Sequence, residues 1–147
     1  MRVLFLCTGN SARSQLAEAL LRRRLDDLAA DGTHVASAGT DPQGVNPLTL
    51  TVLAEIDIDA SDAVSEHLDR YIDGPWDLVI TVCDRAAESC PTFPGAAEQI
   101  HWSTVDPVDV AGDRESQLAA FRGARDTLDT RIQLLLERQQ ITGNNGL

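Results

Sequence analysis

Short apolar runs alternate with longer amphipathic stretches along this chain. The apolar runs occupy residues 3–6, 34–37, 78–82 and, more weakly, 99–102. Continuous runs of this length are typical of parallel strands that are covered on both faces. Apolar residues recur at helical spacing over residues 14–28, 47–56 and 114–138. We therefore predict one α/β domain over residues 1–138, built on a parallel sheet flanked by helices, followed by a flexible polar tail at 139–147.

Two helix starts carry capping signals, one at the helix already predicted over residues 47–56 and one at an additional short helix. Asn46 followed by Pro47 fits an N-cap with proline at the first helical position. The buried face of that helix is expected to extend to Ile56. Ser65 is expected to cap a short helix over residues 66–71, which a Gly-Pro pair then ends.

The loop between the first strand and the first helix holds a cysteine and an arginine six positions apart. It reads Cys-Thr-Gly-Asn-Ser-Ala-Arg-Ser from Cys7 to Ser14. A tight loop that opens into a helix directs N–H groups at one point, and the helix N-terminus adds its positive dipole end. Both features favour the binding of an oxyanion, and both lower the pKa of a thiol placed at that point. Arg13 adds a planar fork of donors, and Ser14 can hydrogen-bond the thiolate.

We interpret Cys7 as a nucleophile that attacks a bound oxyanion. The alternative is a purely structural role, in which Cys7 is a small residue of the hydrophobic core. The strand–loop–helix context favours the nucleophile. The oxyanion would be held by the loop residues Thr8, Gly9, Asn10, Ser11, Ala12 and Arg13.

The charge of the chain limits the kinds of partner that it can bind. The 147 residues include 23 acidic and 12 basic residues, for a net charge of −11, and all the basic residues are arginine. This balance argues against nucleic acid and anionic membrane surfaces as partners. No apolar run is long enough to span a bilayer, and the N-terminus is too short for a signal peptide. With three cysteines, we expect a cytoplasmic protein whose thiols stay reduced.

Asp106-Pro107 lies in the loop that precedes the last helix. A nucleophile that attacks an oxyanion centre expels an oxygen leaving group, which departs more easily when it is protonated. We predict that Asp106 donates this proton. Ordinary turn chemistry is the alternative reading of an Asp-Pro pair.

Two more cysteines follow the third apolar run. Cys83 ends that run as Cys7 ends the first, so both are expected at the carboxyl edge of the sheet, where ligands bind. Cys90 lies seven positions on, a spacing unlike the usual zinc motifs. Two structural thiols are one interpretation. The other is a disulfide relay, in which each thiolate attacks the previous sulfur.

Taken together, these motifs resemble the thioredoxin-coupled arsenate reductases built on the low-molecular-weight protein tyrosine phosphatase fold. The resemblance covers residues 2–138 and implies a four-stranded parallel sheet in the order 2-1-3-4, with helices on both faces. The matching stretches, in order, are residues 7–18, Ser37-Ala38-Gly39, residues 44–47, 57–59 and 77–84, Cys90-Pro91, His101-Trp102 and Asp106-Pro107.

The resemblance also implies roles for matching residues. Cys7 would form a thiol–arsenate adduct, held by Arg13 and the loop amides, and Asp106 would supply the proton. Cys83 would attack Cys7 as arsenite leaves, and Cys90 would then attack Cys83. Thioredoxin would reduce the resulting disulfide, phosphate and sulfate would compete with arsenate, and no cofactor would be required.

Some relatives bind potassium beside the loop. The matching residues here are Asn10, Glu18 and Ser37, with Glu66 where those relatives have an aspartate. Potassium at these four residues is therefore an expectation from the resemblance. The alternative for Glu18 is an ordinary acid on a helix surface.

Three alternative functions stay open. A low-molecular-weight phosphatase would need only Cys7, Arg13 and Asp106, although the segment after Asp106-Pro107 lacks the paired tyrosines of that branch. A reductase recycled by a small thiol such as mycothiol or glutathione is the second. A non-catalytic oxyanion-binding module is the third.

Overall fold

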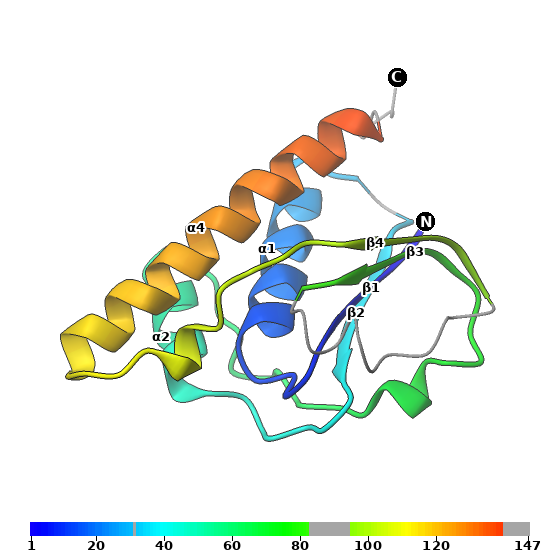
Figure 1. Ribbon diagram of the computed structural model, residues 1–147. Helices are drawn as coiled ribbons and strands as arrows, with labels where there is room; N and C mark the ends of the chain where they lie inside the picture. The colour runs from blue at the N-terminus through cyan, green and yellow to red at the C-terminus, as the bar shows by residue number, and fades with distance from the viewer. Residues whose placement is uncertain (31, 83–94, 140–147) are drawn as a thin grey trace.

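A parallel four-stranded sheet forms the centre of the molecule. The computed structural model describes residues 1–30, 32–82 and 95–139, so Cys83, Cys90 and most of the predicted tail lie outside the described residues. The strand order is β2-β1-β3-β4, as expected (Figure 1). The strands are β1 (Arg2–Cys7), β2 (His34–Gly39), β3 (Trp76–Thr81) and β4 (Ala96–His101).

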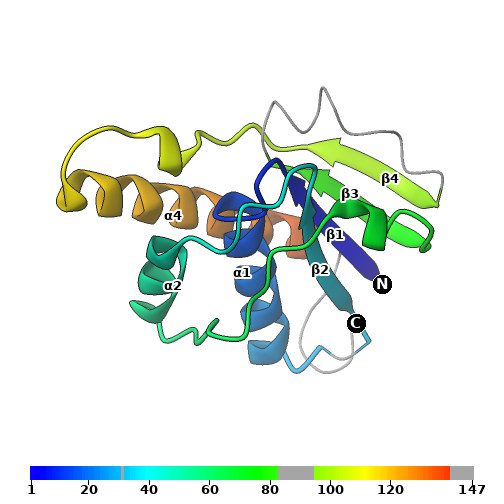
Figure 2. The same ribbon diagram turned by 90° about the horizontal axis from the view of Figure 1, so that it is seen from below.

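Within the described residues, three α-helices cover one face of this sheet (Figures 1 and 2). Val3 and Phe5 of β1 pack against them, whereas Leu4 and Leu6 point to the opposite face, which explains the unbroken apolar run. In the described part of the chain, the helix that contacts this second face is the 3₁₀ helix η1, whose Leu68 packs there. The helices are α1 (Arg13–Asp27), α2 (Pro47–Ala54) and α4 (Arg114–Arg138), with 3₁₀ helices η1 (Leu68–Arg70) and η2 (Pro107–Asp109).

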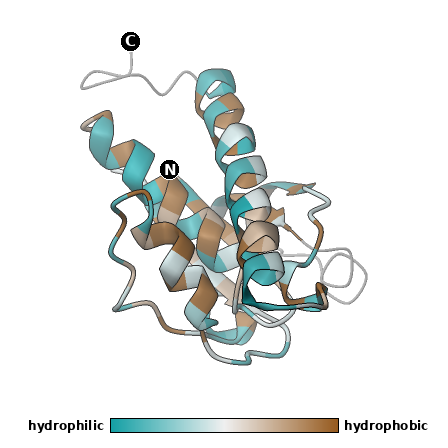
Figure 3. Cartoon of the chain, turned by 90° about the vertical axis from the view of Figure 1, so that its left-hand side faces the viewer, coloured by the Kyte–Doolittle hydropathy of each residue, from teal (hydrophilic) through white to brown (hydrophobic). Residues whose placement is uncertain are grey.

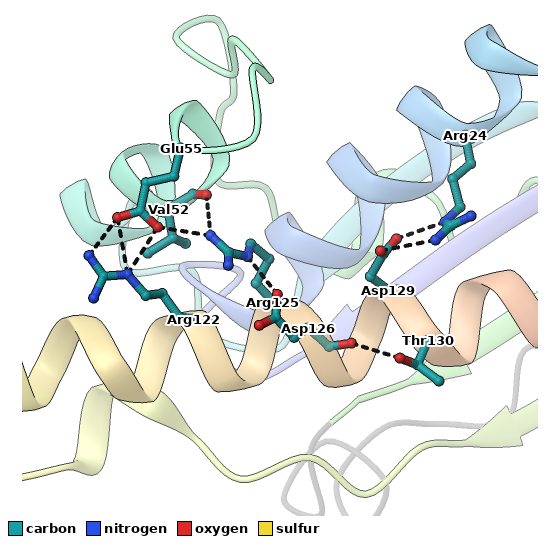
Figure 4. Close-up of polar contacts among 8 residues, drawn as sticks. All are labelled: Arg24, Val52, Glu55, Arg122, Arg125, Asp126, Asp129 and Thr130. Carbon is teal, nitrogen blue, oxygen red and sulfur yellow. Dashed lines mark hydrogen bonds and ion pairs between the residues drawn. The ribbon is translucent and has the colours of Figure 1, made fainter.

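Ion pairs attach α4 to the other two helices. Arg24 of α1 makes a two-pronged pair with Asp129, at 2.7 and 3.0 Å, and Glu55 after α2 contacts both Arg122 and Arg125 (Figure 4). Hydrophobic and hydrophilic residues alternate along α4, as a helix with one buried face requires (Figure 3). The helix is thereby fixed beside α1, whose first turn carries Arg13.

The capping predictions had mixed outcomes. Asn46 caps α2 as predicted, since its side chain accepts a hydrogen bond from Leu48 N–H at 2.9 Å. The predicted buried face was wrong at Ile56, which is 37% exposed, because α2 ends at Ala54 and the chain turns at Asp57, with φ of 64°.

The second capping prediction was wrong in both length and cap. The expected helix over residues 66–71 is reduced to η1. Its cap is His67, whose Nδ1 accepts from Asp69 N–H at 3.0 Å. The Ser65 hydroxyl instead donates to the carbonyl of Gly9, at 3.1 Å, and so supports the cysteine loop.

Candidate active site

Cys7 lies at the end of β1, and the residue is 2% exposed. The N–H of Asn10 donates to its sulfur at 3.2 Å, and Ser14 Oγ lies 2.8 Å away on the first turn of α1. Two groups that can donate hydrogen bonds to one sulfur favour its thiolate form. The local geometry therefore suits a nucleophilic cysteine.

The carbonyls of the loop after Cys7 are turned outward and held there by the surrounding elements. Because a trans peptide places the C=O of one residue opposite the N–H of the next, each outward carbonyl leaves an N–H directed to the inside of the loop. Asn10 N–H, which reaches Cys7 Sγ, is one such group. The carbonyls of Thr8, Gly9, Asn10 and Ser11 accept from Asp41 N, Gln43 N, the Gln15 side chain and Asn46 N, in that order, whereas the Ala12 carbonyl accepts from Leu16 N within the first turn of α1.

The start of α1 adds to this concentration of donors. Ala12 occupies the N-cap position, with no side-chain cap and no acidic residue in the first turn. The first N–H groups of the helix are therefore not neutralised by a carboxylate of that turn, and a helix start of this kind attracts anions. The position of Ala12, Arg13 and the preceding loop agrees with the predicted oxyanion cradle.

Asn10 donates a hydrogen bond to the hydroxyl oxygen of Ser14. Its Oδ1 accepts from the backbone N–H of Glu66 at 2.9 Å, which identifies the other side-chain atom as the donor. That Nδ2 donates to Ser14 Oγ at 2.8 Å and to Ser37 Oγ at 3.0 Å. A thiolate can only accept, so when Cys7 is ionised the Ser14 hydroxyl donates to Sγ while its oxygen accepts from Asn10.

The backbone of Asn10 also depends on its residue type. Its φ is 45°, in the left-handed region that asparagine tolerates better than most residues, and the side chain is fully buried. Asn10 thus supports the loop from behind, and the part of it that reaches the reacting sulfur is its N–H.

Arg13 and Asp106 meet above the loop. Arg13 Nη2 lies 3.1 Å from Asp106 Oδ2, and Nη1 donates to the carbonyl of Thr104 at 3.0 Å. The other carboxylate oxygen of Asp106 accepts from Val108 N–H at 3.0 Å, which caps η2. Both predicted residues therefore reach the site of Cys7, although they are far apart in sequence.

A cavity of about 600 Å³ holds these groups. Its walls contain Cys7, Arg13, Asp106 and every predicted loop residue except the buried Asn10. They also contain Asp41 and Gln43, which the sequence motifs did not single out. The register pairing of Cys7 with Gly39 brings them there, a relationship that no spacing from the cysteine reveals.

The family of the chain can now be established by comparison. The family model described as low molecular weight phosphotyrosine protein phosphatase matches residues 2–144. The chain belongs to this family. An arsenate reductase of Halalkalibacterium halodurans is 40% identical over 135 residues, which is 92% of this chain and 94% of that relative.

Solved structures of the same family share the fold. A structure described as an arsenate reductase in the phosphate binding state has a TM-score of 0.77 and 25% identity, covering 93% of this chain and 97% of the other. The low molecular weight protein tyrosine phosphatase from T. tengcongensis has a TM-score of 0.76 and 26% identity, covering 94% and 99%. The resemblance noted in the sequence is therefore confirmed.

The residues considered for potassium lie together behind the phosphatase-family loop. Ser37 Oγ accepts from Asn10 Nδ2 and donates to Glu18 Oε1 at 2.6 Å. Glu18 Oε2 pairs with Arg22 at 2.8 Å, and Glu66 Oε2 pairs with Arg70 at 2.9 Å.

These oxygens already have donors. Asn10 Oδ1 accepts two N–H groups, and Glu66 Oε2 also accepts the hydroxyl of Tyr71 at 2.8 Å. Burial, together with this hydrogen bond, raises the pKa of Tyr71 to about 12. With a guanidinium beside each carboxylate, the set does not fit an added potassium ion in this arrangement. Glu18 is also more than a surface acid, because Ser37 connects it to Asn10.

Within residues 1–30, 32–82 and 95–139, no three or more histidine, cysteine, aspartate or glutamate side chains are grouped so as to hold a metal ion. No helix in the described ranges is long and apolar enough to cross a membrane.

Proposed function

We propose that this chain reduces arsenate to arsenite, with Cys7 as the nucleophile. The observation that carries the proposal is the position of Cys7 Sγ, between the N–H of Asn10 and the hydroxyl of Ser14, in a cavity shared with Arg13 and Asp106. Arsenate is a tetrahedral oxyanion that such a cradle suits. Relatives named arsenate reductase, aligned over nearly the whole chain, favour it over other oxyanions.

In the first step, the Cys7 thiolate attacks arsenic(V). A sulfur–arsenic bond forms and an arsenic–oxygen bond breaks. The departing oxygen takes a proton from Asp106 and leaves as water. The N–H groups of the loop and the guanidinium of Arg13 hold the remaining oxygens, while Ser14 stabilises the thiolate before attack.

In the second step, the reduction of arsenic uses the remaining cysteines. The Cys83 thiolate attacks Cys7 Sγ, a disulfide forms, and the electron pair of the sulfur–arsenic bond stays with arsenic, which leaves as arsenite. Cys90 then attacks Cys83, which gives a Cys83–Cys90 disulfide and frees the Cys7 thiolate. The balance is arsenate plus two thiols giving arsenite, one disulfide and water. This relay rests on the sequence positions of Cys83 and Cys90.

An external dithiol must reduce that disulfide, and we propose thioredoxin for this role. Exchange with a dithiol restores both Cys83 and Cys90 and leaves the disulfide on the partner. The reducing cytoplasm would keep all three thiols available. Turnover with thioredoxin and thioredoxin reductase, compared with glutathione or mycothiol plus a glutaredoxin-type partner, tests this choice. Turnover with the small-thiol system alone would exclude thioredoxin as the required partner.

The decisive experiment on the reaction is a single-turnover trap. The reduced protein receives one equivalent of arsenate, free thiols are alkylated, and the disulfide is mapped by mass spectrometry. We expect a Cys83–Cys90 bond in the wild type and a Cys7–Cys83 bond in Cys90→Ser. No disulfide among the three cysteines would contradict the reductase and leave an oxyanion-binding module or a phosphatase.

Hydrolysis of phosphate esters is the second candidate, and the assembled Cys7, Arg13 and Asp106 favour it. This chemistry forms a phospho-cysteine that water resolves, so it does not need Cys83. Cys83→Ser separates the two functions. We expect it to abolish arsenite release and to spare any hydrolysis of p-nitrophenyl phosphate. Phosphate and sulfate are expected to inhibit both activities, since they would occupy the same cradle.

A further inference from the structure

The segment that carries Asp106 is held by an arginine from the last helix. Arg131 of α4 uses Nη1 to donate to the carbonyl of Ser103 at 2.7 Å and to Thr104 Oγ1 at 3.1 Å. Its partners are thus a main-chain atom and a side-chain atom on neighbouring residues. Both lie just before Asp106 in the chain.

The same segment is also bound by Arg13, at the end of the cysteine loop. Arg13 donates to the carbonyl of Thr104 at 3.0 Å and pairs with Asp106 at 3.1 Å. Residues 103–106 are therefore contacted by two guanidinium groups, one from the oxyanion cradle and one from α4. If Arg13 turned to a bound oxyanion, Arg131 would still hold Ser103 and Thr104.

We propose that Arg131 is a positioning residue for the proton donor Asp106, an inference that rests on the proposed function. Arg131 is not among the residues that line the active-site cavity, so it acts through the 103–106 segment. Arg131 can hold the segment in a defined place because α4 is itself fixed to α1 and α2 by the ion pairs of Arg24, Arg122 and Arg125 (Figure 4). Small displacements of a catalytic group are costly in rate.

A double-mutant cycle tests whether Arg131 acts through Asp106. We expect Arg131→Met to lower kcat for arsenate roughly tenfold with little change in KM, because the oxyanion cradle stays intact. In an Asp106→Asn background, the same change is expected to cost nothing further, since there is no acid left to position. Arg131→Lys is expected to recover part of kcat, because an ammonium group can still reach one of the two oxygens.

Arg138→Met is the matched control. It removes an arginine from the same helix, paired with Glu98 of β4 at 3.0 Å, without touching residues 103–106. Its kcat should equal that of the wild type, and thermal melts should show both methionine variants folded. An equal loss from Arg131→Met in both backgrounds, or no loss in either, overturns the positioning role.

A measurement without turnover separates this inference from the proposed reaction. The N–H of Val108, which donates to Asp106 Oδ1, reports on the placement of that carboxylate. We expect its hydrogen exchange, followed by NMR, to accelerate in Arg131→Met and to stay unchanged in Arg138→Met. If the wild type produced no arsenite but this exchange pattern appeared, the reductase function would fail while the placement of Asp106 by Arg131 stood. Unchanged exchange in Arg131→Met would overturn the inference whatever the activity.

Discussion

Asp106 forms an ion pair with Arg13, the residue expected to bind the substrate oxyanion, at 3.1 Å. The carboxylate thus takes Nη2 of the guanidinium. An oxyanion that uses the same edge of Arg13 must compete with it. The same contact therefore brings the proposed acid to the reacting centre and opposes oxyanion binding.

This relationship predicts opposite effects of Asp106→Asn on turnover and on binding. The amide cannot supply the proton, so kcat for arsenate should fall by about 10² to 10³. The amide also leaves the charge of Arg13 uncompensated, so inorganic phosphate should bind several-fold more tightly. Calorimetric titration with phosphate measures the dissociation constant for the wild type and the variant. Weaker phosphate binding by the variant would contradict internal competition.

The hydroxyl of Ser14 is predicted to control the reactivity of Cys7. When Cys7 is a thiolate, this hydroxyl donates to its sulfur, 2.8 Å away, and a hydrogen bond to a charged acceptor contributes about 1.5–3 kcal/mol. Ser14→Ala should therefore lower the alkylation rate of Cys7 by iodoacetamide at pH 7 by about tenfold. The measurement is made with Cys83 and Cys90 replaced by serine, so that one thiol reacts. Ser116→Ala, at a serine beside the N-cap of α4, is the control and should leave the rate unchanged.

Gly39 is predicted to be needed for the shape of the cradle. It ends β2 opposite Cys7, and a Cβ there would overlap the carbonyl of Thr8 and lie 2.9 Å from Asn10 N. Gly39→Ala should therefore push the loop out of register, weaken phosphate binding more than tenfold and destabilise the fold by about 1–3 kcal/mol. Gly123→Ala is the control, since a Cβ at that position of α4 meets nothing within 4 Å. Normal phosphate binding by Gly39→Ala would show that the loop can adjust.

The ion pairs of Glu55 predict a pH-dependent contribution to stability. Hydrogen bonding to Arg122, with further help from Arg125, lowers the pKa of Glu55 from 4.5 to about 2. A carboxylate whose pKa is lowered by folding stabilises the protein above its unfolded pKa, and this is lost as pH falls toward the folded value. Glu55→Gln should therefore unfold at lower urea concentration at pH 7, and the gap to the wild type should close between pH 4.5 and 2. A gap independent of pH would assign the effect to packing instead.

Features of the fold and the site could be predicted from the sequence where the residues that form them are neighbours along the chain. The strand order followed from the resemblance, and the cysteine loop was visible because Cys7, Gly9 and Arg13 are neighbours in sequence. Asp41 and Gln43 were missed because they reach the site only through the pairing of β2 with β1. Arg131 was missed because only the packing of α4 brings it to the segment that carries Asp106. Ser65 was misread as a cap, because its hydroxyl has a partner, the Gly9 carbonyl, that only the tertiary fold supplies.

The guanidinium of Arg22 is predicted to make the loop independent of potassium. It pairs with Glu18, which connects through Ser37 to Asn10 behind the cradle. Exchanging sodium chloride for potassium chloride at constant ionic strength should therefore change neither the melting temperature nor the KM for arsenate. Arg22→Gln leaves Glu18 without its cation, so a potassium-dependent rise in melting temperature should appear in that variant. Arg23→Gln, one position further on the same helix and paired with Asp27, should behave like the wild type. A rise in the wild type itself would mean that potassium displaces the arginine, and the charge balance proposed for this site would then be wrong.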